Sequence, residues 1–225
     1  MEIGKVPENV LKRSVFKKLT VKRDEVLVHS GVGEDCSVFS VGEDEAVVLS
    51  TDPITGTAND IGKLAFHVTA NDIASSGAEL IGMLVTIIFP PEAEEKDLKE
   101  IMDAVTGLAA EYQVEILGGH TEVSEAVRQT LVSVTGVGKI KKDRVVKTGG
   151  LKPGQDLVLT KWAGLEGSAI LASEYGEALT KKLKPELIET AKGFSSLLSV
   201  IEDSRIAMEV GVSAMHDVTE GGVYG

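Results

Sequence analysis

Acidic side chains lie beside small or amide residues at three places, each next to the start or the end of a patterned segment of the sequence. Gly33-Glu34-Asp35 precedes an apolar run, Ser50-Thr51-Asp52 ends one, and Asn71-Asp72 comes shortly before Ser75-Ser76-Gly77. Carboxylates delivered from several loops onto one cleft are the ligands that Mg²⁺ prefers, and Mg²⁺ neutralises phosphates during phosphoryl transfer. Each aspartate is also a common turn former or helix cap, so spacing alone leaves both interpretations open.

Alternating strands and helices have to position these segments. Apolar runs predict strands over 36–41, 46–51, 80–89, 114–117 and 130–137. Helical spacing predicts helices over 7–19, 60–75 and 94–112, the last with acidic residues in its first turn, where they complement the helix dipole. This alternation favours an α/β or mixed α+β fold.

A Gly- and Pro-rich stretch over 148–154 predicts a linker to a second patterned region. That region predicts a strand over 156–161, a Gly-rich turn, and helices over 166–175 and 186–210, the second with a break near Gly193. A final segment from 213 begins another loop-and-helix unit. We therefore expect two domains, 1–148 and 149–225, and expect the second to be incomplete.

The composition argues against several classes of function. The 225 residues carry a net charge of −12 with a pI near 4.8, which argues against nucleic acid or an anionic membrane as a partner. The longest apolar run, 83–91, is far shorter than a membrane span. Cys36 is the only cysteine, which excludes an intrachain disulfide and, with no signal-peptide pattern, favours a cytoplasmic protein.

Five segments resemble, in order, the motifs of the PurM-like (AIR synthase-related) superfamily. Residues 33–38 are similar to its Gly-Asp-Asp-Ala-Ala-Val signature, 50–52 to its Thr-Thr-Asp strand end, 71–78 to its Asn-Asp-Ile/Leu-Ala-x-x-Gly-Ala segment, 117–121 to its Gly-Gly-x-Thr turn, and 215–222 to its Asp-x-Thr-x-Gly-Gly loop. Each motif alone is weak. Five motifs in family order across nearly the whole chain make a strong match. The residues of these motifs most resemble those of the HypE type of hydrogenase-maturation protein.

The resemblance implies an N-terminal PurM-like domain with a mixed sheet and flanking helices that dimerises through its sheet. It also implies a C-terminal α+β domain and an ATP site between the two. Such a protein transfers or uses the terminal phosphate of ATP, with Mg²⁺, to activate an acceptor oxygen. A HypE-like member would act in the maturation of a hydrogenase or another metalloenzyme, as a homodimer and with a maturation protein as a further partner.

The resemblance also implies roles for individual residues. The metal ligands would be Glu34, Asp35, Asp52 and Asp72, of which the three aspartates would carry catalysis. The residues near the nucleotide would be Asn71, Gly118, Gly119, His120, Thr121 and Asp217. The two glycines, which lack a Cβ, would let the backbone approach the nucleotide closely.

Several residues depart from the family pattern. Glu34 and His120 stand where aspartate is common, no cysteine follows Cys36 as in the terminal tail of HypE, and none precedes the first acidic motif as in selenophosphate synthetase. Two alternatives therefore stay open: a nucleotide-binding partner that has lost catalysis, and a small-molecule kinase of the thiamine-monophosphate kinase type.

Three further residues have two possible interpretations each. A buried inert thiol is favoured over a nucleophile for Cys36, and a structural role over a ligand role for His67. Lys161, with the turn Gly164 to Ser168, either cradles an anion at a helix start or forms a plain helix entry.

Overall fold

The computed structural model describes residues 8–20, 22–34, 36–55, 60–219 and 221–224. The N-terminal elements are, in chain order, α1 (Glu8–Ser14), the 3₁₀ helix η1 (Phe16–Lys18), β1 (Val26–Val28), β2 (Ser37–Ser40), β3 (Glu45–Ile54), α2 (Ile61–Ser75), β4 (Glu79–Phe89), α3 (Glu95–Glu111), β5 (Glu115–Val123) and β6 (Leu131–Lys141). The later elements are η2 (Lys142–Arg144), η3 (Thr148–Gly150), α4 (Leu165–Leu179), α5 (Pro185–Lys192), η4 (Gly193–Leu197), α6 (Ile201–Val210) and η5 (Gly222–Tyr224).

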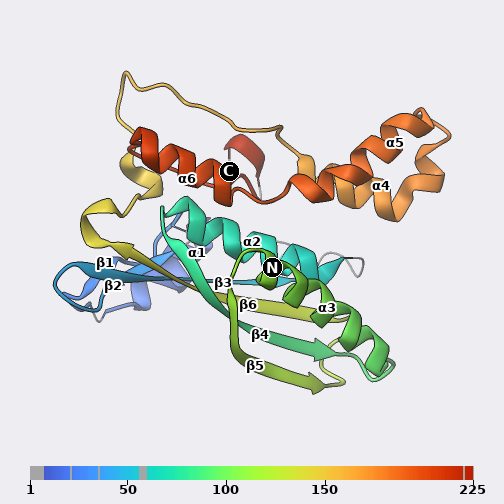
Figure 1. The fold of residues 1–225 in the computed structure, drawn as a ribbon. Helices are drawn as coiled ribbons and strands as arrows, with labels where there is room; N and C mark the ends of the chain where they lie inside the picture. Colours follow the sequence, from blue (N-terminus) through green and yellow to red (C-terminus); the bar gives the residue numbers. More distant parts are fainter. Residues whose placement is uncertain (1–7, 21, 35, 56–59, 220, 225) are drawn as a thin grey trace.

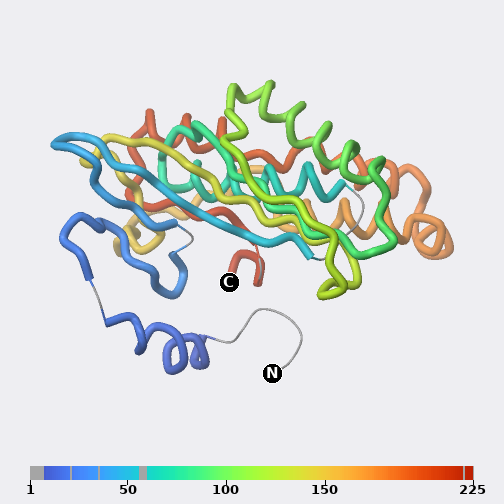
Figure 2. Tube along the Cα trace, turned by 90° about the horizontal axis from the view of Figure 1, so that it is seen from below, coloured from blue at the N-terminus to red at the C-terminus, as the bar shows by residue number. Residues whose placement is uncertain are grey.

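The strands form one six-stranded mixed sheet in the order β1-β2-β3-β6-β4-β5. All neighbours are antiparallel except β4 and β5, which are parallel. Helices α2 and α3 cover one face (Figure 1), and the view from below shows the strands lying across the molecule on the other side (Figure 2). The mixed sheet with flanking helices confirms the predicted α+β class.

The core lies between the sheet and the two helices. On β6 the residues alternate, so that Val132 and Val134 are fully buried on the helix side. Helix α3 places Ile101 and Val105 against this layer, and it begins at a capping box in which the Glu94 backbone N–H donates to Asp97 at 2.8 Å. The predicted helix over 94–112 is therefore confirmed to within a residue.

Helix α2 is buried along almost its whole length because it has neighbours on two sides. Its inner side packs on β3 and β6, and α6 lies along its outer side, as Figure 1 shows. The C-terminal part thus forms a third layer, in which α6 is seated on α2 and α4 and α5 extend beyond it.

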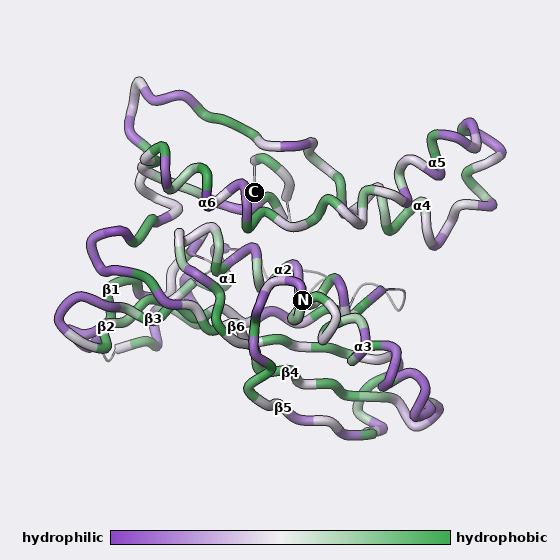
Figure 3. The backbone as a smooth tube through the Cα atoms, in the orientation of Figure 1, coloured by the Kyte–Doolittle hydropathy of each residue, from purple (hydrophilic) through white to green (hydrophobic). Residues whose placement is uncertain are grey.

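The predicted strand over 156–161 is wrong. This stretch has no regular secondary structure, and Leu157 and Val158 are each 79% exposed. Figure 3 shows hydrophobic colouring on the loop that passes over α6. The composition suits a strand, but no described strand lies beside it, so its backbone groups have no ladder to join.

Other elements differ from the prediction in their limits. The helix expected over 186–210 is three pieces, α5, η4 and α6, interrupted at Gly193 as predicted and again at 198–200. The strand expected over 114–117 continues to Val123 as β5, and the short β1 was not predicted. The domain boundary at 148 stays a prediction. In the described part of the chain, no helix has the length and apolar character that a membrane crossing requires.

Candidate functional site

Two of the predicted aspartates meet where β3 ends its buried stretch against the last turn of α2. Asp72 is 3% exposed, and its Oδ2 accepts a hydrogen bond of 2.5 Å from the Ser50 hydroxyl. The same hydroxyl lies 3.5 Å from Oδ2 of Asp52, a half-buried residue two positions along β3. Ser50 therefore joins the two carboxylates.

The surroundings disfavour a charged Asp72. Burial raises the pKa of this carboxyl far above its usual range, and the hydrogen bond with Asp52 and the negative charge of Asp217 raise it further. The Ser50 hydroxyl acts in the opposite direction and is outweighed. Neither Asp52 nor Asp72 forms an ion pair with any Lys or Arg that the structure describes. This arrangement is one that a bound cation would relieve.

Asp217 brings the C-terminal part into the same site. It is 7% exposed, in the loop that follows α6, and its charge acts on Asp72. The site is thus assembled from β3, α2 and the loop over 213–219. This position agrees with the predicted role of Asp217 near the nucleotide, which stays a prediction.

The first acidic motif lies beside the same end of α2. Asp35 falls outside the described residues, but Glu34 and Cys36 line a hollow together with Ser75 and Ser76. The buried Cys36 thiol donates to the backbone carbonyl of Asp72 at 3.2 Å, which fits the inert role expected for it.

The described residues alone do not complete a metal site. Within the described ranges, no three His, Cys, Asp or Glu side chains are grouped so that they could hold a metal ion. The donor chemistry nevertheless fits Mg²⁺, because Asp52 and Asp72 supply oxygen ligands next to each other without a described cationic partner. The metal roles of Glu34, Asp35, Asp52 and Asp72 stay predictions.

The side chain of Asn71 contacts the turn that precedes α6. Its amide nitrogen donates to the Leu198 carbonyl at 2.9 Å, and its Oδ1 accepts from the Val200 backbone N–H at 2.9 Å. Both polar ends of this side chain are therefore engaged by one turn of backbone.

The segment 118–121 lies inside strand β5 rather than in a turn. Along the sheet, Asp52 pairs with Val134, Val134 with Val85, and Val85 with Gly119. Three strand spacings separate Asp52 from Gly119, roughly 14 Å. Within one chain, Gly118, Gly119, His120 and Thr121 are thus set apart from the carboxylates.

His120 also points to the other face of the sheet. It pairs with Thr86, whose neighbours on β4, Val85 and Ile87, are buried on the helix side. The Nε2 atom of His120 lies 2.7 Å from the Glu122 carboxylate, and both side chains are exposed. The backbone of Gly119 approaches the neighbouring strand β4 closely: a Cβ at Gly119 would lie 1.8 Å from the Val85 carbonyl oxygen.

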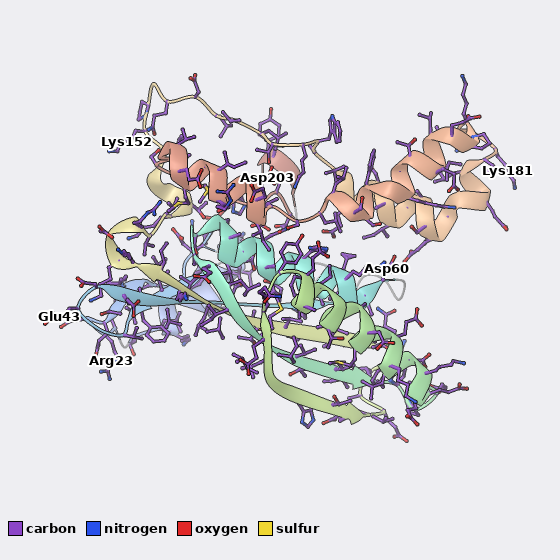
Figure 4. The ribbon with its side chains drawn as sticks, viewed as in Figure 1. Arg23, Glu43, Asp60, Lys152, Lys181 and Asp203 are labelled. Carbon is purple, nitrogen blue, oxygen red and sulfur yellow. The ribbon has the colours of Figure 1, made fainter. Side chains whose placement is uncertain are left out.

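Sequence reasoning missed the role of Ser50 and left two interpretations of Lys161 open. Ser50 stood in a recognised motif, but only the tertiary contact of β3 with α2 reveals that it joins the aspartates. The ammonium of Lys161 donates to the Ser199 carbonyl and lies 2.9 Å from Oδ2 of Asp203. Asp203 belongs to α6 and is labelled in Figure 4. This ion pair favours the helix-entry interpretation of the Lys161 turn.

The chain matches two sequence profiles. Residues 33–140 match the AIR synthase related protein, N-terminal domain, and residues 152–225 match its C-terminal domain.

Curated relatives of the chain are enzymes and maturation proteins. The chain is 27% identical over 229 residues to a protein of Methanocaldococcus jannaschii named for hydrogenase expression/formation (98% of this chain, 64% of that protein). It is 28% identical over 198 residues to carbamoyl dehydratase HypE of Cupriavidus necator (85% and 54%). It is 29% identical over 204 residues to selenide, water dikinase of Carboxydothermus hydrogenoformans (88% and 56%). The chain therefore spans between about half and two thirds of the length of these relatives.

Solved structures share the fold. The AaThiL complex with AMPPCP and TMP superposes with a TM-score of 0.69 at 17% identity, covering 85% of this chain and 61% of the other. E. coli HypE superposes with a TM-score of 0.65 at 25% identity, covering 79% and 55%.

Proposed function

The chain belongs to the AIR synthase-related family, and we propose that it binds ATP together with Mg²⁺ and uses the terminal phosphate to activate an acceptor oxygen. The observation that carries this proposal is the meeting of Asp52 and Asp72 at Ser50, with the charge of Asp217 beside them. Such a buried acidic site lowers the stability of the protein when no cation is bound. It suits a protein that receives a cation together with a polyanionic ligand.

The chain's own residues would act by binding and orienting. Asp52 and Asp72 would hold Mg²⁺ through carboxylate oxygens, joined by Glu34 and Asp35 from the neighbouring segment. The Ser50 hydroxyl would keep the Asp72 carboxylate oriented. When bound, Mg²⁺ supplies neutralisation of the phosphate charge that develops during transfer. The protein contributes position and charge, not a covalent nucleophile.

A HypE-like role gives the acceptor we favour. Relatives of this chain include a carbamoyl dehydratase and a protein named for hydrogenase expression/formation. An ATP-bound HypE structure shares the fold at 22% identity and a TM-score of 0.52. We therefore propose a carbamoyl or related amide oxygen as the acceptor, and a metalloenzyme-maturation protein of the cytoplasm as the partner that presents it.

A homodimer is the assembly we propose. The sheet face away from α2 and α3 leaves apolar side chains uncovered, and Ile81, Leu84 and Leu117 are between 37% and 49% exposed. β5 pairs only with β4 among the described strands, so its other edge is open. A second copy would cover this edge and face, which a single chain leaves as an association hazard.

Turnover with acceptors separates this function from its alternatives. The 225-residue chain is incubated with γ-labelled ATP and Mg²⁺, and labelled phosphate is followed with carbamoyl, acyl and phosphomonoester acceptors. Phosphate release that depends on a carbamoyl or acyl acceptor supports the proposal. Transfer to a phosphomonoester would instead identify a kinase related to the ThiL fold neighbours. ATP binding with no release from any acceptor would identify a partner protein that has lost catalysis.

A further inference from the structure

The C-terminal part is held on α2 by a contact that sits next to the proposed metal site. Asn71 directly precedes Asp72, and its amide makes both of its hydrogen bonds to the turn at 198–200, with Leu198 O and Val200 N, each at 2.9 Å. These bonds join residues 127 and 129 positions apart in the chain.

This turn is the start of α6. Val200 is the N-cap residue of α6 and has no side-chain hydrogen bond that caps the helix. The orphan donor that a helix start leaves at Val200 is accepted instead by a side chain of α2. One turn further on, the Ser204 hydroxyl donates to the Ala74 carbonyl of α2. Helix α6 is thereby fixed in register along α2, with Asn71 at its beginning.

The turn is also held from its other side, by Lys161. The ammonium of Lys161 donates to the Ser199 carbonyl and pairs with Asp203 at 2.9 Å. The backbone at Lys161 is left-handed, with φ 56°, which is uncommon for a residue other than glycine. The turn is therefore contacted from two sides, by Asn71 of α2 and by Lys161.

The loop that follows α6 carries Asp217, the third carboxylate of the site. The chain leaves α6 at Gly211, and six residues later Asp217 lies buried with its charge acting on Asp72. The loop that carries Asp217 begins where α6 ends, so the position of α6 on α2 sets where this loop starts.

We infer that Asn71 is a positioning residue: it seats the 198–200 turn on α2 and so places Asp217 beside Asp72, without contacting the nucleotide phosphates itself. This replaces the phosphate-side role that the family resemblance implies for Asn71. The seating of α6 is independent of any ligand, whereas the effect on affinity rests on the proposed function.

Hydrogen exchange in the ligand-free chain measures the seating directly. In Asn71→Ala, backbone amides at 198–201 are expected to exchange up to about 30-fold faster than in the unaltered chain, which corresponds to about 2 kcal/mol, or about 1 kcal/mol for each of two lost hydrogen bonds. Asn71→Asp keeps an acceptor for Val200 and loses the donor to Leu198, so its exchange should be intermediate. Asn9→Ala, on exposed α1, is the matched control and should change nothing.

Calorimetric titration of Mg·ATP measures the positioning. We expect Asn71→Ala to weaken Mg·ATP binding several-fold, within the 30-fold limit, while Asn9→Ala leaves it unchanged. Weaker binding with unaltered exchange at 198–201 would assign Asn71 to the phosphates and overturn the inference. Faster exchange with unaltered affinity would overturn it as well, because the seat would then not reach the site. If the unaltered chain binds no Mg·ATP, the proposed function fails by itself, and the exchange at 198–201 still decides whether Asn71 seats α6.

Discussion

Asp72 occupies a position where a carboxylate weakens the fold that contains it. It is buried beside Asp52, under the charge of Asp217, and its strongest described compensation is the Ser50 hydroxyl. A residue that destabilises the empty protein is typical of a functional site, where stability is given up for ligand binding.

We predict that Asp72→Asn stabilises the metal-free protein while abolishing Mg²⁺-dependent ATP binding. The amide can still accept the Ser50 hydrogen bond and is neutral at every pH, so the variant avoids the free-energy cost of protonating Asp72 on folding. A gain of about 1 kcal/mol is expected, roughly 2–4 °C in Tm for a chain of this size. Differential scanning calorimetry in EDTA checks the first part. Asp103→Asn, on the exposed side of α3, is the matched control. A lower Tm for Asp72→Asn than for this control would contradict the account.

His67 is a structural histidine, as the sequence suggests, and it carries a pH-dependent cost. Its ring packs edge-on against the stacked rings of Phe66 and Tyr112, with centroids 5.8 and 6.3 Å away, and its Nδ1 has no hydrogen-bond partner among the described atoms. Burial, and then the charges of Lys161 and Lys63, lower the pKa of His67 to about 4.

This pKa predicts a loss of stability on acidification. Between the unfolded value of about 6.5 and the folded value of about 4, only the unfolded state takes up the proton, so His67 lowers the free energy of unfolding as pH falls through this window. The loss at pH 5 should be about 2 kcal/mol. Asp72 titrates with the opposite sign, so the measurement is the difference between His67→Gln and the unaltered chain in urea unfolding at pH 8 and pH 5. That difference should shift in favour of the variant at pH 5, and parallel behaviour of the two proteins would refute the assignment.

The packing of strand β5 against β4 explains why glycine stands in the segment 118–121. Gly119 has φ 152° and approaches the Val85 carbonyl of β4 so closely that no Cβ fits. Gly118 also has a positive φ, but a Cβ there would meet only Leu84, at 3.6 Å. The two glycines therefore differ in what a side chain would encounter.

We predict that Gly119→Ala destabilises the fold by about 3 kcal/mol or more, because strained backbone and a steric clash add. Gly118→Ala should cost clearly less. Urea unfolding of the two variants checks this order. If Gly118→Ala proved equal to or worse than Gly119→Ala, the packing of β5 on β4 described above would be wrong.

The sheet face away from α2 and α3, with its exposed apolar side chains, leads to a prediction about the dimer. A charge in an apolar dimer interface is strongly unfavourable, so Leu84→Glu should convert a dimer to a monomer at micromolar concentration. Leu171→Glu on α4, where the leucine is 54% exposed, is the control and should remain dimeric. Size-exclusion chromatography with light scattering measures both. A Leu84→Glu dimer, or a monomeric unaltered chain, would contradict the proposed assembly.

Sequence patterns predict the elements of the N-terminal part well and those of the C-terminal part poorly, for a physical reason. Helix α3 and strand β6 carry their own periodicity, which is set by the core that they face. The stretch 156–161 has strand-like residues, but a strand needs a neighbour, and no local pattern contains that neighbour. The break at 198–200 was missed because it is fixed by Asn71 and Lys161, both remote in sequence.

At the scale of the whole molecule, the site is where three layers meet. The sheet contributes Ser50 and Asp52, α2 contributes Asp72, and the part that follows α6 contributes Asp217. The motifs identified these aspartates as candidates, but their convergence depends on how α6 is seated on α2, which no short motif encodes. His120 and Thr121 show the limit of such reasoning, since they belong to a matching motif and yet lie across the sheet in the single chain.

The most direct test of the account is calorimetric titration of the 225-residue chain with ATP, in the presence of Mg²⁺ and again in EDTA. We predict binding that requires Mg²⁺ and that Asp72→Asn removes, while Asp103→Asn retains it. Binding of equal strength in EDTA, or undiminished Mg²⁺-dependent binding by Asp72→Asn, would contradict the claim that the buried carboxylates hold the cation for the nucleotide.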